Sequence, residues 1–143
     1  MTIGRAAGVD LWRSVDQSGN SLEATRRNAI VEGVADRVEL HTGDMTALPF
    51  EDNNFDVVVS SLAIHNISGS AGREKAITEA VRVLRPGGRL MIADIRATRQ
   101  HQEQLAKNGM NDVGRRRLGW RFWWGGPWGA TYLVTATKPE SRI

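Results

Sequence analysis

Short apolar runs alternate with stretches of helical periodicity along this chain, and that alternation restricts its fold more than any other feature. The clearest run, Val57-Val58-Val59, is continuous and β-branched, which is typical of a strand buried on both faces of a parallel sheet. Parallel strands need long crossover connections, usually helices. The predicted order of elements, β-α-β-β-α-β-α-β-β, therefore indicates a layered α/β domain.

The apolar runs predict strands over residues 5–11, 38–42, 55–62, 89–95, 119–124 and 128–138. The last two flank the turn Gly125-Gly126-Pro127, so we expect them to form a hairpin.

Three stretches are predicted as helices. In the first, Asn20 precedes Glu23 by three residues, which resembles a capping box, and Gly33 lies where a helix terminator is expected. Pro86 ends the second helix because proline cannot continue the backbone ladder. The third helix is polar and covers residues 98 to about 111. The second helix carries an apolar stripe of Ala76, Ile77, Ala80, Val81 and Leu84.

Length and composition are those of one soluble globular domain, because 143 residues include 41% hydrophobic and 24% charged side chains. No apolar run approaches the roughly 20 residues of a membrane-spanning helix, and residues 1–10 do not resemble a secretory signal. The absence of cysteine excludes disulfides, thiolate zinc sites and a cysteine nucleophile. We expect a cytoplasmic protein and predict no metal site.

The net charge of +3 is a mild basic excess, and its densest cluster is Arg115-Arg116-Arg117 with Arg121 nearby. A solvated surface is the favoured interpretation of this cluster, and a phosphate-binding patch is the alternative. No pattern of a nucleic-acid-binding module accompanies the charge, so no nucleic-acid partner is predicted.

Two acidic residues come at the ends of predicted strands, Asp10 in the first and Asp44 just after the second. Ligands of open α/β sheets bind at the carboxyl ends of strands, where a carboxylate can accept hydrogen bonds from both hydroxyls of a ribose. A carboxylate can also accept from an adenine amino group while a neighbouring side chain such as Met45 packs on the ring. The alternatives are a loop or capping role for Asp10 and a turn cap for Asp44.

Further segments follow one another in the order and spacing of a known family. They are Gly43-Asp44-Met45, Leu48-Pro49-Phe50-Glu51-Asp52-Asn53-Asn54-Phe55-Asp56, the strand over residues 57–62, Ala63-Ile64-His65-Asn66 and Arg82-Val83-Leu84-Arg85-Pro86-Gly87-Gly88. Together they resemble the class I, S-adenosylmethionine-dependent methyltransferases, and most of all the branch of ubiquinone and menaquinone methyltransferases. The resemblance covers residues 5 to 139.

The resemblance implies a Rossmann-like, doubly wound and mostly parallel sheet of seven strands, the last two of which form an antiparallel hairpin. It implies S-adenosylmethionine as the cofactor, with Asp10 on the ribose and Asp44 and Met45 on the adenine. It assigns a structural role to Asp56 and to the turn Pro86-Gly87-Gly88. Three further residues are expected to line the cofactor pocket or to add apolar contact to the adenine: Ser61, Leu11 and Trp12.

The chain departs from this family before Asp10. Family members begin with a strand and a glycine-rich loop that approaches the methionine end of the cofactor, but residues 1–9 contain no Gly-x-Gly-x-Gly pattern. In the family sheet the missing strand lies between the strands predicted over residues 5–11 and 55–62. We therefore expect a truncated domain with two unpaired strand edges and with weak or absent cofactor binding.

Methyl transfer needs a general base only where the acceptor carries a proton. His65 is the candidate for that base, because it follows the strand beside the expected methyl group. The alternative is a turn or packing role. His41, within a strand, and His101, on the polar helix, have weaker claims.

The segment from Trp120 to Trp128 contains four of the five tryptophans. An edge hairpin whose aromatics cover the sheet is the favoured interpretation, and an apolar acceptor site or a membrane-interface contact is the alternative.

The resemblance thus favours a transferase that moves a methyl group to a small or lipid-like acceptor. The second hypothesis is a non-catalytic remnant or fragment of such a domain. A nicotinamide-dependent dehydrogenase shares the acidic residue after a strand, but it lacks support from Leu48-Pro49-Phe50 and from the predicted hairpin.

Overall fold

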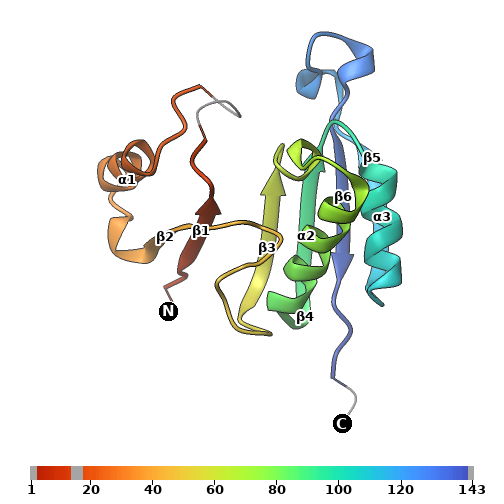
Figure 1. The fold of residues 1–143 in the computed structure, drawn as a ribbon, viewed down its shortest axis with the longest axis horizontal. Coiled ribbons are helices and arrows are strands. Elements are labelled where there is room, and N and C mark those ends of the chain that lie inside the picture. The colour runs from red at the N-terminus through yellow and green to blue at the C-terminus, as the bar shows by residue number, and fades with distance from the viewer. Residues whose placement is uncertain (1–2, 14–17, 142–143) are drawn as a thin grey trace. The chain divides into compact units, whose positions relative to one another are not determined.

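The computed structural model describes residues 3–13 and 18–141 (Figure 1). The chain forms two compact units, residues 1–49 and 50–143. Met1 lies outside the described residues.

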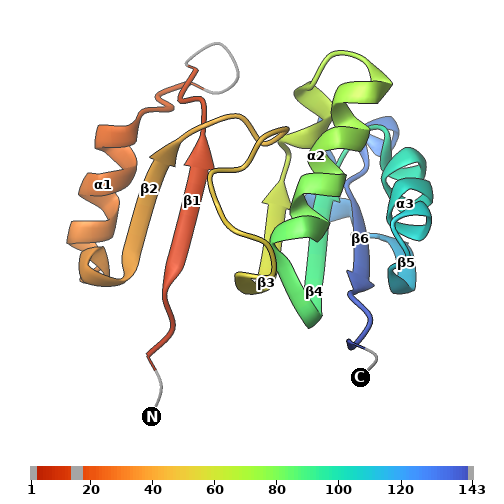
Figure 2. The same cartoon turned by 60° about the horizontal axis from the view of Figure 1, so that its bottom comes forward.

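The first unit is a β-α-β crossover. Strand β1 (Ala6–Asp10) is followed by helix α1 (Leu22–Val31), the 3₁₀ turn η1 (Ala35–Arg37) and strand β2 (Val38–Thr42). The two strands are parallel and in register from the pair Ala6 and Val38 to the pair Asp10 and Thr42 (Figure 2). Both predicted strands and the helix between them are therefore confirmed.

Helix α1 begins one residue later than the capping-box prediction places it. The N-cap is Ser21, whose hydroxyl accepts a hydrogen bond of 3.1 Å from the backbone N–H of Ala24. The prediction that Asn20 caps this helix is wrong, because the Asn20 amide instead donates to the Asp10 carboxylate. Serine and asparagine are about equally good N-caps, so the sequence alone does not distinguish the two positions.

The predicted terminator of α1 is confirmed. Gly33 has a φ of 70°, a left-handed conformation that costs glycine little. Its N–H donates to Ile30 O at 3.0 Å, and the N–H of Val34 donates to Ala29 O at 2.9 Å. This pair of bonds is the Schellman pattern, which satisfies the last helical carbonyls.

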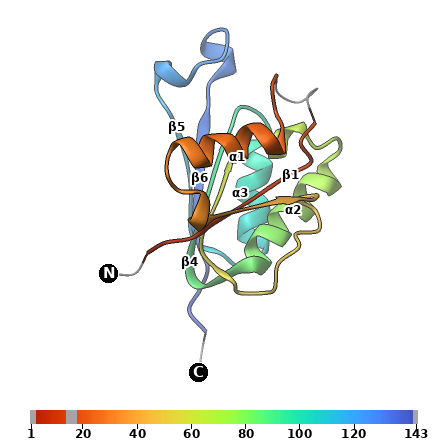
Figure 3. The same ribbon diagram turned by 90° about the vertical axis from the view of Figure 1, so that its left-hand side faces the viewer.

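The second unit is a four-stranded sheet in the order β3-β4-β6-β5. Strand β3 runs parallel to β4, whereas β6 is antiparallel to both β4 and β5. Helices α2 and α3 lie side by side on one face of the sheet (Figures 2 and 3). The elements are β3 (Phe55–Ser61), the 3₁₀ turn η2 (Ile64–Asn66), α2 (Ser70–Val83), β4 (Leu84–Asp94), α3 (Thr98–Lys107), β5 (Asn111–Arg117), η3 (Trp120–Phe122), η4 (Pro127–Gly129) and β6 (Tyr132–Thr137).

The core of the described chain lies in the second unit. All the buried apolar side chains found among the described residues are at position 64 or beyond. The predicted apolar stripe of α2 is confirmed, because each of its members is buried: Ala76, Ile77, Ala80, Val81 and Leu84.

The predicted order of strands and helices is confirmed, but the strand predicted over residues 119–124 is wrong. The fifth strand is β5, and residues 119–131 instead contain the two 3₁₀ turns η3 and η4. Strand β5 lies at the edge of the sheet and is built from polar residues, so it carries no alternating apolar signal. The third helix was predicted to extend to about residue 111, which is the first residue of β5, but α3 ends at Lys107.

The prediction that the valine run is buried on both faces is also wrong. In β3, Val57 is 50% exposed and Val59 is 68% exposed. Strand β3 is the edge of its sheet, and β1 is an edge of the two-stranded sheet, so both strands carry the expected unpaired edge within the described residues.

The end of α2 differs from the prediction in its cause. The helix ends at Val83, before Pro86, and the segment Pro86-Gly87-Gly88 already belongs to β4. The last carbonyls of the helix are satisfied from other segments. The ammonium of Lys138 donates to Val81 O at 2.8 Å and to Leu84 O at 2.6 Å. Burial lowers the pKa of Lys138.

We expect Lys138→Met to lower the free energy of unfolding by about 1–3 kcal/mol, since it removes charge-assisted hydrogen bonds to backbone carbonyls. Urea denaturation followed by circular dichroism measures the change. Lys75→Met is the control, because Lys75 is an exposed lysine of α2. This substitution is expected to lower the free energy of unfolding by less than about 0.5 kcal/mol. Equal losses in the two variants would contradict the proposed role of Lys138.

Candidate functional site

The first unit brings the two predicted acids to the same end of its sheet. Asp10 is the last residue of β1, and Asp44 lies two residues after the end of the parallel strand β2. The N–H of Gly43 donates to Asp10 O at 3.1 Å, which ties the two strand ends together. Both carboxylates thus follow the carboxyl ends of neighbouring parallel strands, the place where open α/β sheets bind ligands.

The Asp10 carboxylate is held by local donors. It accepts from the backbone N–H of Trp12 at 2.8 Å, and the Asn20 amide lies 3.3 and 3.4 Å from its two oxygens. An ionised carboxylate offers about four acceptor positions, so acceptor capacity remains for a diol. Asp10 is half-buried, and it is oriented before any ligand arrives.

Asp44 forms a turn with the residue two positions on. One carboxylate oxygen accepts from the backbone N–H of Thr46 at 2.8 Å and from the Thr46 hydroxyl at 2.7 Å. The turn-capping role that the sequence left open is therefore present. Asp44 is exposed, and the neighbouring Met45 is half-buried.

Leu11 and Trp12 follow β1 directly. Leu11 is 47% exposed, and Trp12 adopts a left-handed backbone with a φ of 57°, which is uncommon for a bulky residue. The indole Nε1 of Trp12 is buried without a hydrogen-bond partner among the described residues. This buried donor lies close in sequence to the oriented Asp10 carboxylate and to the exposed Leu11 side chain.

The second unit contains the other two predicted site residues, Ser61 and His65. Ser61 is the exposed last residue of β3, as predicted. The chain then turns at Leu62, whose φ is 53° and whose N–H donates to Ala93 O at 2.8 Å. The turn η2 follows and places His65 over the carboxyl end of β4.

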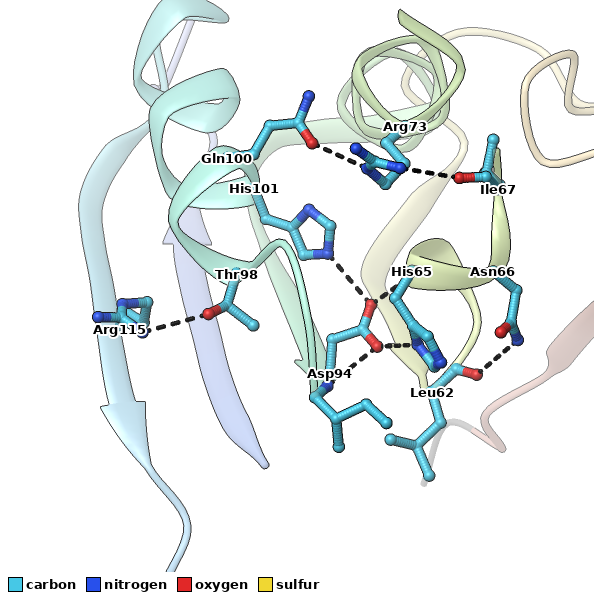
Figure 4. A network of polar contacts seen from close by, with 11 residues as sticks. Leu62, His65, Asn66, Ile67, Arg73, Asp94, Thr98, Gln100, His101 and Arg115 are labelled. Carbon is cyan, nitrogen blue, oxygen red and sulfur yellow. Dashed lines mark hydrogen bonds and ion pairs between the residues drawn. The ribbon is translucent and has the colours of Figure 1, made fainter. Parts of the chain in front are cut away.

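His65 lies against a buried carboxylate at the end of β4 (Figure 4). Asp94 is fully buried, and its Oδ1 contacts the Nδ1 of His65. Its Oδ2 accepts from the backbone N–H of His65 at 3.0 Å and lies 3.1 Å from Nε2 of His101. One carboxylate thus orients two imidazoles and joins β4, η2 and α3.

This arrangement suits proton transfer by His65. A carboxylate at Nδ1 favours the tautomer that carries its proton on that nitrogen, which leaves Nε2 as the proton acceptor. The side chain of His65 is 8% exposed, whereas His101 is completely buried on α3. His101 therefore supports Asp94, and His41 belongs to β2, where it lies 3.6 Å from Glu39.

No group of three or more histidine, aspartate or glutamate side chains in the described ranges, 3–13 and 18–141, could hold a metal ion. The His65–Asp94–His101 cluster is accordingly a hydrogen-bonded network.

Asp94 is the functional candidate that the sequence reasoning missed. It ends a predicted strand in the same way as Asp10, so the rule that selected Asp10 also applies to it. The sequence did not indicate the two histidine partners of Asp94, because His101 is seven positions away and His65 is 29 positions away.

The segments that carry the family resemblance also contact one another. Arg82 of α2 donates to Phe50 O and to the Asp52 carboxylate, both at 2.8 Å, and it pairs with Glu79. These carboxylates raise the pKa of Arg82. Asp56 is the second residue of β3 and pairs with Arg85 at 2.6 Å on the surface, in line with the structural role that the resemblance implies.

Comparison with known proteins gives a consistent family. The family model described as "Methyltransferase domain" matches residues 5–92. The chain is 42% identical over 91 residues to the ubiquinone/menaquinone biosynthesis C-methyltransferase UbiE of Roseobacter denitrificans. The matched region covers 64% of this chain and 33% of that protein. The chain is also 42% identical over 99 residues to the UbiE protein of a Ruegeria species, covering 69% of this chain and 36% of that protein. The chain thus spans about a third of the length of these relatives.

Solved structures agree on the fold. The [4+2]-cyclase SpnF superposes with a TM-score of 0.75 at 20% identity, covering 96% of this chain and 67% of that one. Geranyl diphosphate methyltransferase in complex with SAM superposes with a TM-score of 0.70 at 16% identity, covering 94% and 69%. The predicted Rossmann-like architecture is confirmed. A cyclase and a methyltransferase share it, so the fold alone does not specify the reaction.

We expect Asp94→Asn to lower the free energy of unfolding by about 1–3 kcal/mol. Each carboxylate oxygen accepts from a backbone N–H, Oδ1 from Ile95 and Oδ2 from His65, so an amide NH₂ in either place faces a donor. Chemical denaturation measures the loss. The control is Asp56→Asn, whose exposed ion pair is worth less than about 1 kcal/mol. Asp94 would lose its assigned role if the two variants were equally stable.

Proposed function

Because this chain belongs to the methyltransferase domain family, we propose that it takes part in methyl transfer from S-adenosylmethionine to a small or lipid-like acceptor. The observation that carries the proposal is the pair of acids, Asp10 and Asp44, at the carboxyl ends of neighbouring parallel strands. The UbiE relatives are named as C-methyltransferases of ubiquinone and menaquinone biosynthesis, which supports an acceptor of the lipid-like class.

The first unit holds the adenosine in this proposal. Asp10 accepts from the ribose hydroxyls while Trp12 and Asn20 keep its carboxylate in place. Asp44 accepts from the adenine amino group, and Met45 packs on the ring. Leu11 and Trp12 contribute apolar contact to the adenine. The lining role of Ser61 stays a prediction.

S-adenosylmethionine, when bound, supplies the electrophilic methyl group, so the protein's task is to position the acceptor and to remove its proton. His65 is the proposed general base. Asp94 holds the imidazole at Nδ1 and stabilises the positive charge that the ring gains when Nε2 takes a proton. Asp94 is therefore a positioning residue.

The alternative function is that of a non-catalytic fragment with little affinity for the cofactor. It is supported by the absence of a Gly-x-Gly-x-Gly pattern from the sequence given. In both cases we propose that residues 1–143 make up one incomplete methyltransferase domain. A measurement of cofactor binding distinguishes the methyltransferase from the non-catalytic fragment better than a measurement of activity does.

A titration with S-adenosylhomocysteine, followed by NMR, tests the proposed adenosine site. We expect weak binding that shifts the amide signals of Asp10, Asp44 and their neighbours. Asp10→Asn should weaken that binding by about 1–3 kcal/mol, or about five- to 150-fold, because the diol loses an ionised acceptor.

The control for this titration is Asp36→Asn, which alters an exposed aspartate of η1 in the same unit. Its affinity should equal that of the wild type. If no signal at the ends of β1 and β2 moves at millimolar ligand, the fragment alternative holds and the cofactor assignment fails.

The second experiment concerns His65. With quinol or phenol acceptors, His65→Gln should lower the rate of S-adenosylhomocysteine production by about 10²–10⁴-fold, the usual contribution of a general base. Its affinity for S-adenosylhomocysteine should remain unchanged. His41→Gln, a histidine of β2, should leave the rate unchanged. A His65→Gln variant with the wild-type rate would refute the proposed base.

A further inference from the structure

The segment between β5 and β6 exposes an unusual number of aromatic side chains. Figures 1 and 3 show this segment projecting away from the sheet and the helices of the second unit. We call it the aromatic turn. The interpretation of these aromatics as a cover for the sheet is wrong, because they face solvent: Trp120 is 69% exposed, Phe122 54%, Trp123 39%, Trp124 59% and Trp128 85%.

Hydrogen bonds within the aromatic turn connect its two ends. Trp123 and Ala130 form an antiparallel bridge, and the N–H of Trp124 donates to Gly129 O at 2.9 Å. The hydroxyl of Thr131 donates to Phe122 O at 2.7 Å. A Cβ on Gly129 would collide with the carbonyl of Trp124, so only glycine permits this close approach. The aromatic side chains are therefore presented on a braced backbone.

The charge around the aromatic turn has one sign. No aspartate or glutamate occurs from residue 113 to residue 139, whereas this stretch contains four arginines. Arg121 lies 5.5 Å from the ring of Trp120, and Arg117 lies 5.8 Å from the ring of Trp123. Arg116 and Arg121 are exposed. Cations are thus interleaved with tryptophan rings on one projecting surface.

We propose that the aromatic turn docks onto the surface of an anionic lipid bilayer. Tryptophan prefers the boundary between hydrocarbon and headgroups because its ring is apolar and its N–H is polar. Arginine is attracted to anionic headgroups, and no carboxylate in this stretch opposes that attraction. Soluble monomers rarely expose aromatic patches of this kind without a binding role. None of the helices in residues 3–13 and 18–141 is long and apolar enough to span a membrane.

The inference does not depend on the proposed function, because vesicle binding needs neither cofactor nor acceptor. Co-sedimentation of the whole chain with vesicles tests it, using equal parts of phosphatidylcholine and phosphatidylglycerol against phosphatidylcholine alone. We expect binding to the anionic vesicles that falls as salt is added, together with a blue shift of tryptophan emission.

Two pairs of variants make the test specific. Trp124→Ser with Trp128→Ser should weaken binding on the order of tenfold, since two exposed apolar anchors are lost. Its control is Ile30→Ser with Val31→Ser, which alters exposed apolar residues of α1. Arg116→Gln with Arg121→Gln should weaken binding to anionic vesicles by about fivefold per arginine. Its control is Arg26→Gln with Arg27→Gln on α1.

Three outcomes would overturn the proposal. The first is no binding to anionic vesicles. The second is equal binding by the variants and their controls. The third is a wild-type dimer that the tryptophan substitutions convert to monomer in light scattering, because the aromatic turn would then be an interface between two copies of this chain.

Discussion

Strand β4 carries hydrogen-bonded neighbours along both edges, β3 in parallel and β6 in the antiparallel direction. A central strand must also bury at least one face, and Leu90 and Ile92 of β4 are buried. Helix α2 covers β4 with its apolar stripe, and α3 packs beside α2 over β5 and β6. Leu105 is the buried apolar residue of α3, and the other two buried residues of that helix are Thr98 and His101.

The candidate base follows from the same strand. Where β4 ends, Asp94 still points to the buried face, and a buried carboxylate needs donors to offset its lost hydration. The backbone N–H groups of His65 and Ile95 and the rings of His65 and His101 surround it. The carboxylate is therefore part of the structure as well as of the proposed chemistry, and His65 acquires its orientation from a group that the fold must satisfy in any case.

Sequence patterns predicted the fold where one face of an element is apolar. The stripe of α2 and the pair of strands β1 and β2 were found in this way. The patterns failed at β5, whose polar edge position leaves no apolar alternation, and at the aromatic turn, whose high strand propensity is overridden by its glycines. They also placed the N-cap of α1 one residue early, where two good capping residues adjoin.

The candidate site was predictable to the extent that it depends on strand ends. Asp10 and Asp44 were predicted because an acidic residue at the end of a strand can be recognised from the sequence alone. The parallel pairing of β1 and β2 then brings both residues to the same edge of the sheet. The contact of His65 with Asp94 was not predicted from the sequence, because the two residues are 29 positions apart and meet at a buried carboxylate.

The two units differ in how firmly they hold their functional groups. Asp94 and His65 are anchored in the buried core of the second unit, whereas the described residues of the first unit include no fully buried side chain. Asp10 and Asp44 depend instead on short-range donors, Trp12 and Asn20 for the one and Thr46 for the other. A ligand that binds only the folded form stabilises it in proportion to its occupancy. Adenosine bound between the ends of β1 and β2 would therefore supply order that apolar burial does not supply to the first unit, while His65, the proposed base, is positioned by Asp94 without it.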